Sequence, residues 1–263
     1  MKYLQSFKFN KKIMYSFLVD LVAILIILGL FTMLALTLNA KAYKLSNGQD
    51  IESFKAELLE GDLERNQEFY VNVQSFVITF FLGGLLTLIL TFLIFSYSRS
   101  VLWNYLTKNK FNFKIRWRWN LLNLLLLLIF VGYLIIHLLI ILLTSLITLM
   151  IHPVVYTLLL GIINFVLFTF WILIIFLIYH SFAKKEKVGQ AIMEGFHLLK
   201  EQWKPLRKVY LFALLTVFIL NLLLYLLTIT ILPYSILTTL LNLLIFIIFV
   251  SWMRVYTLNT IKK

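Results

Sequence analysis

The stretch from Leu121 to Ala183 contains no Asp, Glu, Lys or Arg, and it constrains the fold more than any other feature of the chain. A helix that crosses a bilayer needs about 20 apolar residues. The stretch is too long for one crossing and suits two, with a break at His152 and Pro153. Because uncharged runs of this length belong in hydrocarbon, the chain is predicted to be a polytopic helical membrane protein.

The composition extends this prediction to the whole chain. Hydrophobic residues make up 62% of the sequence and charged residues 13%, whereas soluble domains are roughly 45–50% apolar and about 25% charged. The predicted fold class is all-α: a transmembrane helical bundle of six spans, forming a single domain over residues 1–263. The predicted spans cover residues 13–38, 75–97, 121–151, 154–182, 209–232 and 234–255. Gly83 and Gly84 predict a close helix approach or a kink within the second span.

The charges are distributed unevenly along the chain. Residues 41–68 hold seven acids and four bases, a charge of −3, whereas the remainder holds 20 bases and four acids, a charge of +16. This positive-inside pattern predicts a cell-membrane protein with both termini and the segments 98–120 and 184–208 in the cytoplasm, and with residues 39–74 outside. Anionic membrane lipid is therefore the expected partner of the bases, and nucleic acid is not.

Other sequence signals restrict the chemistry. The chain has no cysteine, which rules out disulfides and thiolate ligands. No nucleotide-binding, nucleophile or zinc-binding motif is present, so no cofactor, metal site or catalytic residue is predicted. Abundant Lys, Asn, Ile and Phe indicate a prokaryotic source. The first span is expected to remain uncleaved: Ala40 to Ala42 has the form of a cleavage site, but the apolar run is too long for a signal peptide and contains Asp20.

The external segment, residues 39–74, carries most of the acids. Asn47 and Gly48 indicate a turn, and a helix is predicted between Asp50 and Gly61. This helix is expected to cover the outer mouth of the bundle with its polar face in solvent. The alternative is a lid for a ligand or a partner protein.

The segment 184–208 reads KKEKVGQAIMEGFHLLKEQWKPLRK and predicts an amphipathic helix in the headgroup region. Its predicted apolar face consists of Val188, Ala191, Ile192, Phe196, Leu199 and Trp203. The predicted headgroup contacts of this and the preceding basic segment are Lys184, Lys185, Lys187, Arg116 and Arg118. Similar basic, aromatic segments precede the first and third spans, so the six spans are also interpreted as three helical-hairpin repeats, each entered through a basic elbow.

Ionisable and amide side chains within the spans are the remaining candidates for function. They are Asp20, His137, Asn164, Asn221 and Asn242. Asp20 is expected to pair with a base of an elbow, with a proton relay as the alternative. Asn221 and Asn242 are predicted to share a depth, to face the bundle interior and to bridge helices as a polar clamp. His137 and Asn164 form a looser analogue, and a ligand site is the alternative for both pairs.

The fragment QAIMEGFHLLKEQWKPL, followed by an apolar span, resembles the elbow of a group of six-span prokaryotic proteins. The group includes the membrane domain attached to some glycerophosphodiester phosphodiesterases. The run of a small residue, a glycine, a leucine, a base and a tryptophan is matched by Ala191, Gly195, Leu199, Lys200 and Trp203. The resemblance covers this elbow and the six-span layout. It implies a membrane module and carries over no catalytic residue.

The predicted function is therefore a non-catalytic membrane module that engages anionic lipid or a membrane-protein partner. The alternative is a transporter or permease for a small neutral solute or a lipid. Pro153 and Pro233 lie at turns, and no acid or base lies at mid-span, which argues against ion-coupled transport. An intramembrane enzyme ranks third, because His137 has no nucleophile or metal partner in the sequence pattern.

Overall fold

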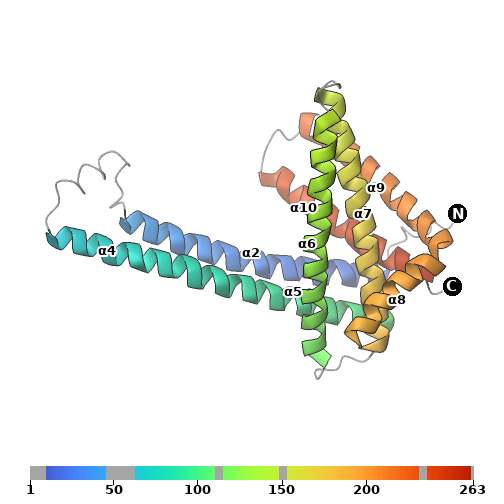
Figure 1. The fold of residues 1–263 in the computed structure, drawn as a ribbon, viewed down its shortest axis with the longest axis horizontal. Helices are drawn as coiled ribbons and strands as arrows, with labels where there is room; N and C mark the ends of the chain where they lie inside the picture. Colours follow the sequence, from blue (N-terminus) through green and yellow to red (C-terminus); the bar gives the residue numbers. More distant parts are fainter. Residues whose placement is uncertain (1–9, 46–62, 110–114, 148–152, 231–235, 262–263) are drawn as a thin grey trace. The chain divides into compact units, whose positions relative to one another are not determined.

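The computed structural model of the chain describes residues 10–45, 63–109, 115–147, 153–230 and 236–261, and these residues contain helices and no strand (Figure 1). The predicted all-α fold with six candidate spans is confirmed. By length and hydropathy, the described helices that can cross a membrane are Lys11–Leu45, Gln67–Thr107, Arg116–Ser145, Leu159–Lys185, Trp203–Leu224 and Leu237–Ile261. The chain is thus a multi-pass integral membrane protein. Its spans are helices because hydrocarbon offers the backbone no hydrogen-bond partners, and a helix satisfies its backbone groups internally.

The described helices contain most of the predicted apolar runs and extend beyond several of them: the helix that contains the second span, predicted over residues 75–97, already begins at Leu63. In chain order they are α2 (Lys11–Leu45), α4 (Leu63–Ile78), the π-helix η1 (Thr79–Gly83), α5 (Gly84–Thr107), α6 (Arg116–Ile147), α7 (Pro153–Lys185), α8 (Val188–Glu201), α9 (Trp203–Thr230) and α10 (Ile236–Ile261). Helix α7 begins at Pro153, where proline's missing N–H costs no helical hydrogen bond. The predicted helix between Asp50 and Gly61 and the turn at Pro233 lie outside the described residues.

The chain divides into two compact units, which are considered separately. The described part of residues 22–95, here called the hairpin unit, consists of most of α2, all of α4 and η1, and α5 as far as Phe95. Lys41 Nζ donates to the carbonyl and the hydroxyl oxygens of Ser75, at 3.2 and 2.5 Å. A Cβ added to Gly83 would lie 3.0 Å from Leu34 Cδ1. The close helix approach predicted at this glycine is therefore present, and the π-helix ends there.

Residues 1–21 and 96–263 form the second unit, here called the main unit. Its core surrounds the C-terminal half of α7, in which nearly every residue from 171 to 183 is buried. Trp103 of α5 and Trp119 of α6 pack onto this half through Tyr179. Helix α7 is apolar on all sides, which is the pattern of a central helix. From the sequence alone this pattern predicts a membrane crossing and does not distinguish a central helix from a peripheral one.

Helix α8 packs closely against the end of α7. Ala191 and Gly195 are its buried residues, and a Cβ on Gly195 would lie 2.6 Å from Ile178 Cγ1 and 3.1 Å from its Cα. Two residues of the predicted apolar face, Phe196 and Trp203, do not take part in this packing, because their side chains are 44% and 39% exposed. Phe196 lies about 100° around the helix from Gly195, and Trp203 begins the next helix, α9.

The C-terminus of α7 is held by side chains from the α5–α6 region. Glu186 adopts a left-handed backbone conformation (φ 56°), and its N–H donates to Phe182 O at 2.8 Å. The Asn109 amide donates to Ala183 O, and Arg118 Nη1 donates to Glu186 O at 3.2 Å. These donors satisfy carbonyls that a helix end leaves without partners, and they bring the basic ends of α5, α6, α7 and α8 together.

Candidate functional site

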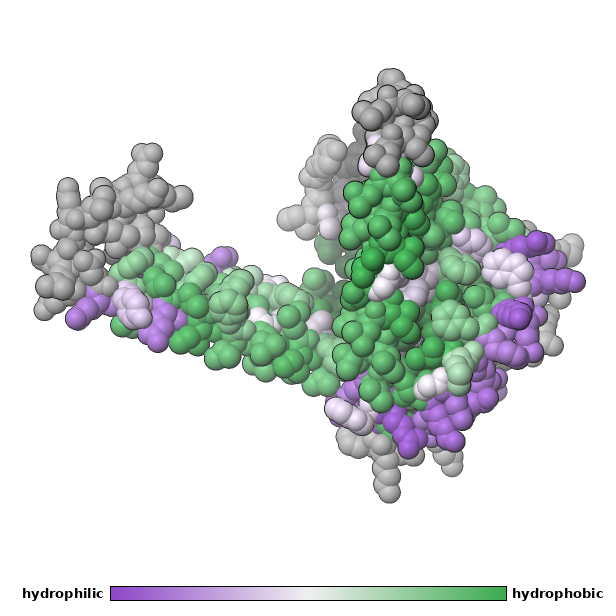
Figure 2. Space-filling view, in the orientation of Figure 1, coloured by the Kyte–Doolittle hydropathy of each residue, from purple (hydrophilic) through white to green (hydrophobic). Residues whose placement is uncertain are grey.

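Basic side chains gather where α7 ends and α8 begins. Lys184, Lys185, Lys187 and Arg118 are exposed there, and Arg116 is half-buried with its guanidinium 5.3 Å from the centre of the Tyr97 ring. Figure 2 shows hydrophilic surface over α8 and the start of α9, whereas the surface of α6 and α7 is mostly hydrophobic. All five predicted headgroup contacts thus lie in the main unit. The region around the junction of α7 and α8 that carries these bases is here called the basic end.

The side of α8 that faces away from α7 has two different sectors. Met193 and Phe196 are 69% and 44% exposed, and Lys200 is exposed beside them. At 100° per residue these three side chains fall within about 60° of one another. The next sector is polar: it contains His197 and Glu201, with His197 Nδ1 3.2 Å from Glu201 Oε2. The helix therefore presents an apolar, basic strip next to a polar one.

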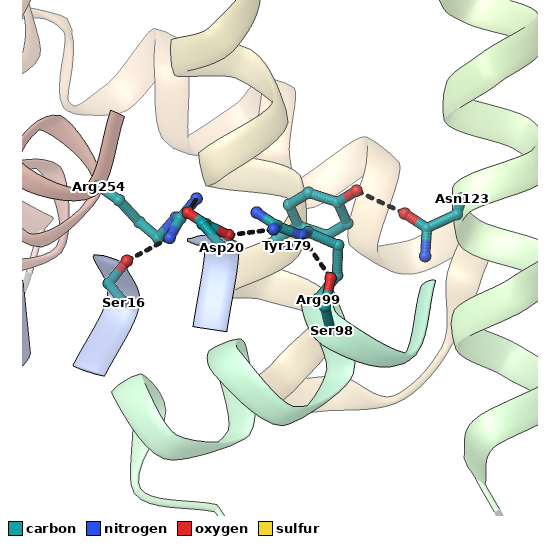
Figure 3. A network of polar contacts seen from close by, with 7 residues as sticks. All are labelled: Ser16, Asp20, Ser98, Arg99, Asn123, Tyr179 and Arg254. Atoms are coloured by element: carbon teal, nitrogen blue, oxygen red, sulfur yellow. Dashed lines mark hydrogen bonds and ion pairs between the residues drawn. The ribbon is translucent and has the colours of Figure 1, made fainter. Parts of the chain in front are cut away.

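A buried ion-pair network lies within the main unit (Figure 3). Asp20 is 5% exposed, and its carboxylate lies between two guanidinium groups. Arg99 Nη2 donates to Asp20 Oδ1, and Arg254 Nη2 donates to Asp20 Oδ2 at 3.0 Å. Arg254 Nη1 also donates to Ser16 Oγ. The pairing of Asp20 with an elbow base is present, since Arg99 belongs to the basic segment 98–120.

Arg254 was not predicted as part of this network. It is fully buried, and its guanidinium lies 5.3 Å from the centre of the Phe176 ring. One carboxylate thus joins the first turns of α2 to α5 and α10 through charge-assisted hydrogen bonds, which are stronger than neutral ones. The signal that could have identified Arg254 is that it is the one base inside the predicted last span, where a buried acid needs a counter-charge.

A second chain of hydrogen bonds runs beside the ion pairs. The Tyr179 hydroxyl donates to Asn123 Oδ1, and Asn123 Nδ2 donates to Ser96 Oγ at 3.0 Å and to Trp119 O at 2.8 Å. Asn123 and Tyr179 were not singled out from the sequence. A sequence signal for Asn123 exists: it is an amide isolated in an apolar run. In hydrocarbon such an amide must find a partner on a neighbouring helix.

The polar clamp predicted for Asn221 and Asn242 is wrong. Both side chains are exposed on the main unit, and Asn221 Nδ2 donates to Val217 O of its own helix at 3.1 Å. Counting residues from the turn predicts only a depth and says nothing of the direction in which each side chain projects. The two asparagines therefore do not face the bundle interior.

His137 and Asn164 differ from that pair because both are partly buried. The His137 ring stacks on Tyr133, with ring centroids 5.9 Å apart. His137 Nδ1 and Asn164 Oδ1 are buried without a hydrogen-bond partner among the described residues.

The described part of the chain contains no group of three or more His, Cys, Asp or Glu side chains that could hold a metal ion. Its charged cluster around Asp20 can bridge helices, and its exposed bases can attract anions. No protein-family model, curated protein or solved structure matches the chain significantly.

Proposed function

We propose that this integral membrane protein is a non-catalytic module whose basic end binds anionic lipid headgroups at the cytoplasmic surface of the cell membrane. The observation that carries the proposal is the outward strip of α8, where Met193 and Phe196 are exposed beside Lys200. Apolar side chains next to lysines are typical of helices that lie in the headgroup region. The opposite side of α8 is fixed to α7 through Gly195.

The charges around α8 also support binding of anionic headgroups at this end of the main unit. Lys184, Lys187 and Arg118 are exposed near the start of α8, so several bases can meet lipid phosphates together. Each base near an anionic surface contributes about 1 kcal/mol of attraction. The positive-inside distribution supports a cytoplasmic position for this end and for both termini.

The elbow resemblance fits the proposal as a membrane module of the kind attached to some glycerophosphodiester phosphodiesterases. The close approach of Gly195 to Ile178 gives a physical reason for a glycine at this position. The lysine and the tryptophan that follow it are Lys200, which is exposed, and Trp203, which is 39% exposed and packs edge-to-face on Phe170. A second candidate function, transport of a neutral solute or a lipid, is favoured by two buried atoms, His137 Nδ1 and Asn164 Oδ1, which have no hydrogen-bond partner within the described part of the chain.

Lipid retention tests the proposal. Replacing Lys184, Lys187 and Lys200 together with glutamine is expected to weaken binding of phosphatidylglycerol by about 3 kcal/mol at low salt, roughly a hundredfold. These three lysines are exposed, and Lys185 is kept because it pairs with Glu194 at 2.7 Å. Native mass spectrometry of the purified protein with added phosphatidylglycerol and phosphatidylcholine measures the effect.

The matched control is the triple replacement of the same lysines with arginine, which keeps the charge and should keep the binding. Raising the salt concentration should reduce the difference between the two triple variants, because salt screens exposed charges. Equal phosphatidylglycerol binding by the glutamine and arginine variants at low salt would mean that these lysines bind no lipid headgroup.

A further inference from the structure

Several buried polar atoms of the main unit lack a hydrogen-bond partner among the described residues, and two of them lie on the facing helices α6 and α7. His137 Nδ1 on α6 and Asn164 Oδ1 on α7 are buried, and neither has a hydrogen-bond partner among the described residues. Burying such an atom without a partner is unfavourable, and hydrocarbon offers no water to replace it. Each atom therefore calls for a group that can bond to it.

His137 lies on the side of α6 that faces α7. Trp119, Asn123, Phe130 and Tyr133 all contact α7, and they lie on one side of α6 because they recur at intervals of three, four and seven residues. His137 follows Tyr133 by four residues, and its ring stacks on the Tyr133 ring. The stripe that packs against α7 therefore includes His137.

The register between the two helices places Asn164 opposite His137. Trp119 contacts Phe182 with ring centroids 4.7 Å apart, and Phe130 contacts Trp171 with centroids 6.0 Å apart. Residue numbers therefore rise along α6 while those of the contacting residues fall along α7, so the two helices are antiparallel. Seven residues after Phe130 is His137, and seven before Trp171 is Asn164, which is about 10.5 Å of rise on each helix. Two helical turns also return each side chain to the same face.

The chemistry of the two atoms selects the partner. Asn164 Oδ1 can only accept a hydrogen bond, whereas His137 Nδ1 donates in one neutral tautomer. A carbonyl group could satisfy only the histidine. A hydroxyl group can donate to the amide oxygen and accept from the imidazole at the same time.

We propose that His137 and Asn164 bind the hydroxyl group of a membrane-soluble alcohol, such as a lipid with a free hydroxyl. The partly exposed ring of Tyr133, stacked on the buried Trp171 with ring centroids 5.4 Å apart, offers an apolar surface for the body of the ligand. Leu138, the neighbour of His137, is 58% exposed, so the ligand can approach from the bilayer. The proposal does not depend on lipid binding at the basic end, which involves other residues.

Photolabelling with two matched probes tests it. The probes are a hexadecanol and a hexadecane that carry the same diazirine on the same carbon, each added to vesicles that contain the full chain. Mass spectrometry of the cross-linked peptides should show labelling of residues 130–143 and 159–171 about fivefold stronger with the alcohol, the factor expected for one net hydrogen bond. His137→Leu or Asn164→Leu should remove the difference, whereas Asn221→Leu on α9 should leave it unchanged.

Equal labelling of the wild-type chain by the two probes overturns the proposal. His137 and Asn164 would then be joined by a direct hydrogen bond or by a water molecule. A preference for the alcohol that survives both leucine replacements overturns it as well, because the hydroxyl would then be recognised elsewhere. The wild-type comparison requires no substitution, so it decides the matter even where a variant does not fold.

Discussion

Replacing Asp20 with asparagine is expected to lower the free energy of unfolding by about 3–5 kcal/mol. The substitution keeps the shape of the side chain but leaves Arg99 and Arg254 buried without the carboxylate that lies between them. Unfolding by SDS in mixed micelles, followed by tryptophan fluorescence, measures the loss. Trp103, Trp119 and Trp252 report on it because they are buried in the main unit.

Two variants control this experiment. Glu68 is exposed on the hairpin unit, so Glu68→Gln should change the free energy of unfolding by less than about 0.5 kcal/mol. The triple variant Asp20→Leu, Arg99→Met and Arg254→Met should recover most of the lost stability, since apolar residues avoid the desolvation of buried charges. If Asp20→Asn is no more destabilising than Glu68→Gln, the network does not hold α2, α5 and α10 together.

The second large effect is expected at Gly195. Its replacement with alanine would put a Cβ 2.6 Å from Ile178 Cγ1 and 3.1 Å from the Ile178 backbone, so α8 has to shift along α7. Overpacking of this kind lowers the free energy of unfolding by about 1–3 kcal/mol. The same SDS titration measures it.

Gly189 provides the matched control on the same helix. A Cβ there meets no atom within 4 Å, so Gly189→Ala should raise the stability by up to about 1 kcal/mol through helix propensity. Opposite signs at the two glycines identify close packing as the reason for Gly195. A stabilising Gly195→Ala would show that α8 does not rest on α7 in the membrane.

The fold class could be predicted from the sequence because it depends on run length and charge. An uncharged stretch such as 121–183 has few alternatives to membrane helices, and its length requires two of them. The charge pattern also indicated that Asp20 needs a base. That Arg254 is the second partner of Asp20 could not be predicted, because it depends on how α10 packs beside α2. The two residues are 234 positions apart in the chain.

The predictions that failed were those that required a side-chain direction in an almost uniformly apolar helix. In α9 and α10 nearly every position is hydrophobic, so the pattern does not tell the buried side from the lipid side, and Asn221 and Asn242 were assigned to the wrong one. Helix α8 has a clearer pattern, and the spacing of its apolar residues predicts one apolar face. That spacing does not tell which of these residues pack on α7, as Ala191 does, and which are exposed, as Phe196 is, because an interfacial helix also exposes apolar residues.

The central claim is that the outward strip of α8 lies in the headgroup region, and spin-label accessibility tests it most directly. The chain has no cysteine, so Phe196→Cys and Gln190→Cys give single labelling sites about 120° apart on α8. In vesicles with anionic lipid, we predict that the label at 196 collides more with oxygen and the label at 190 more with a water-soluble nickel complex. Equal exposure of both labels to the nickel complex would place α8 in water and contradict the account.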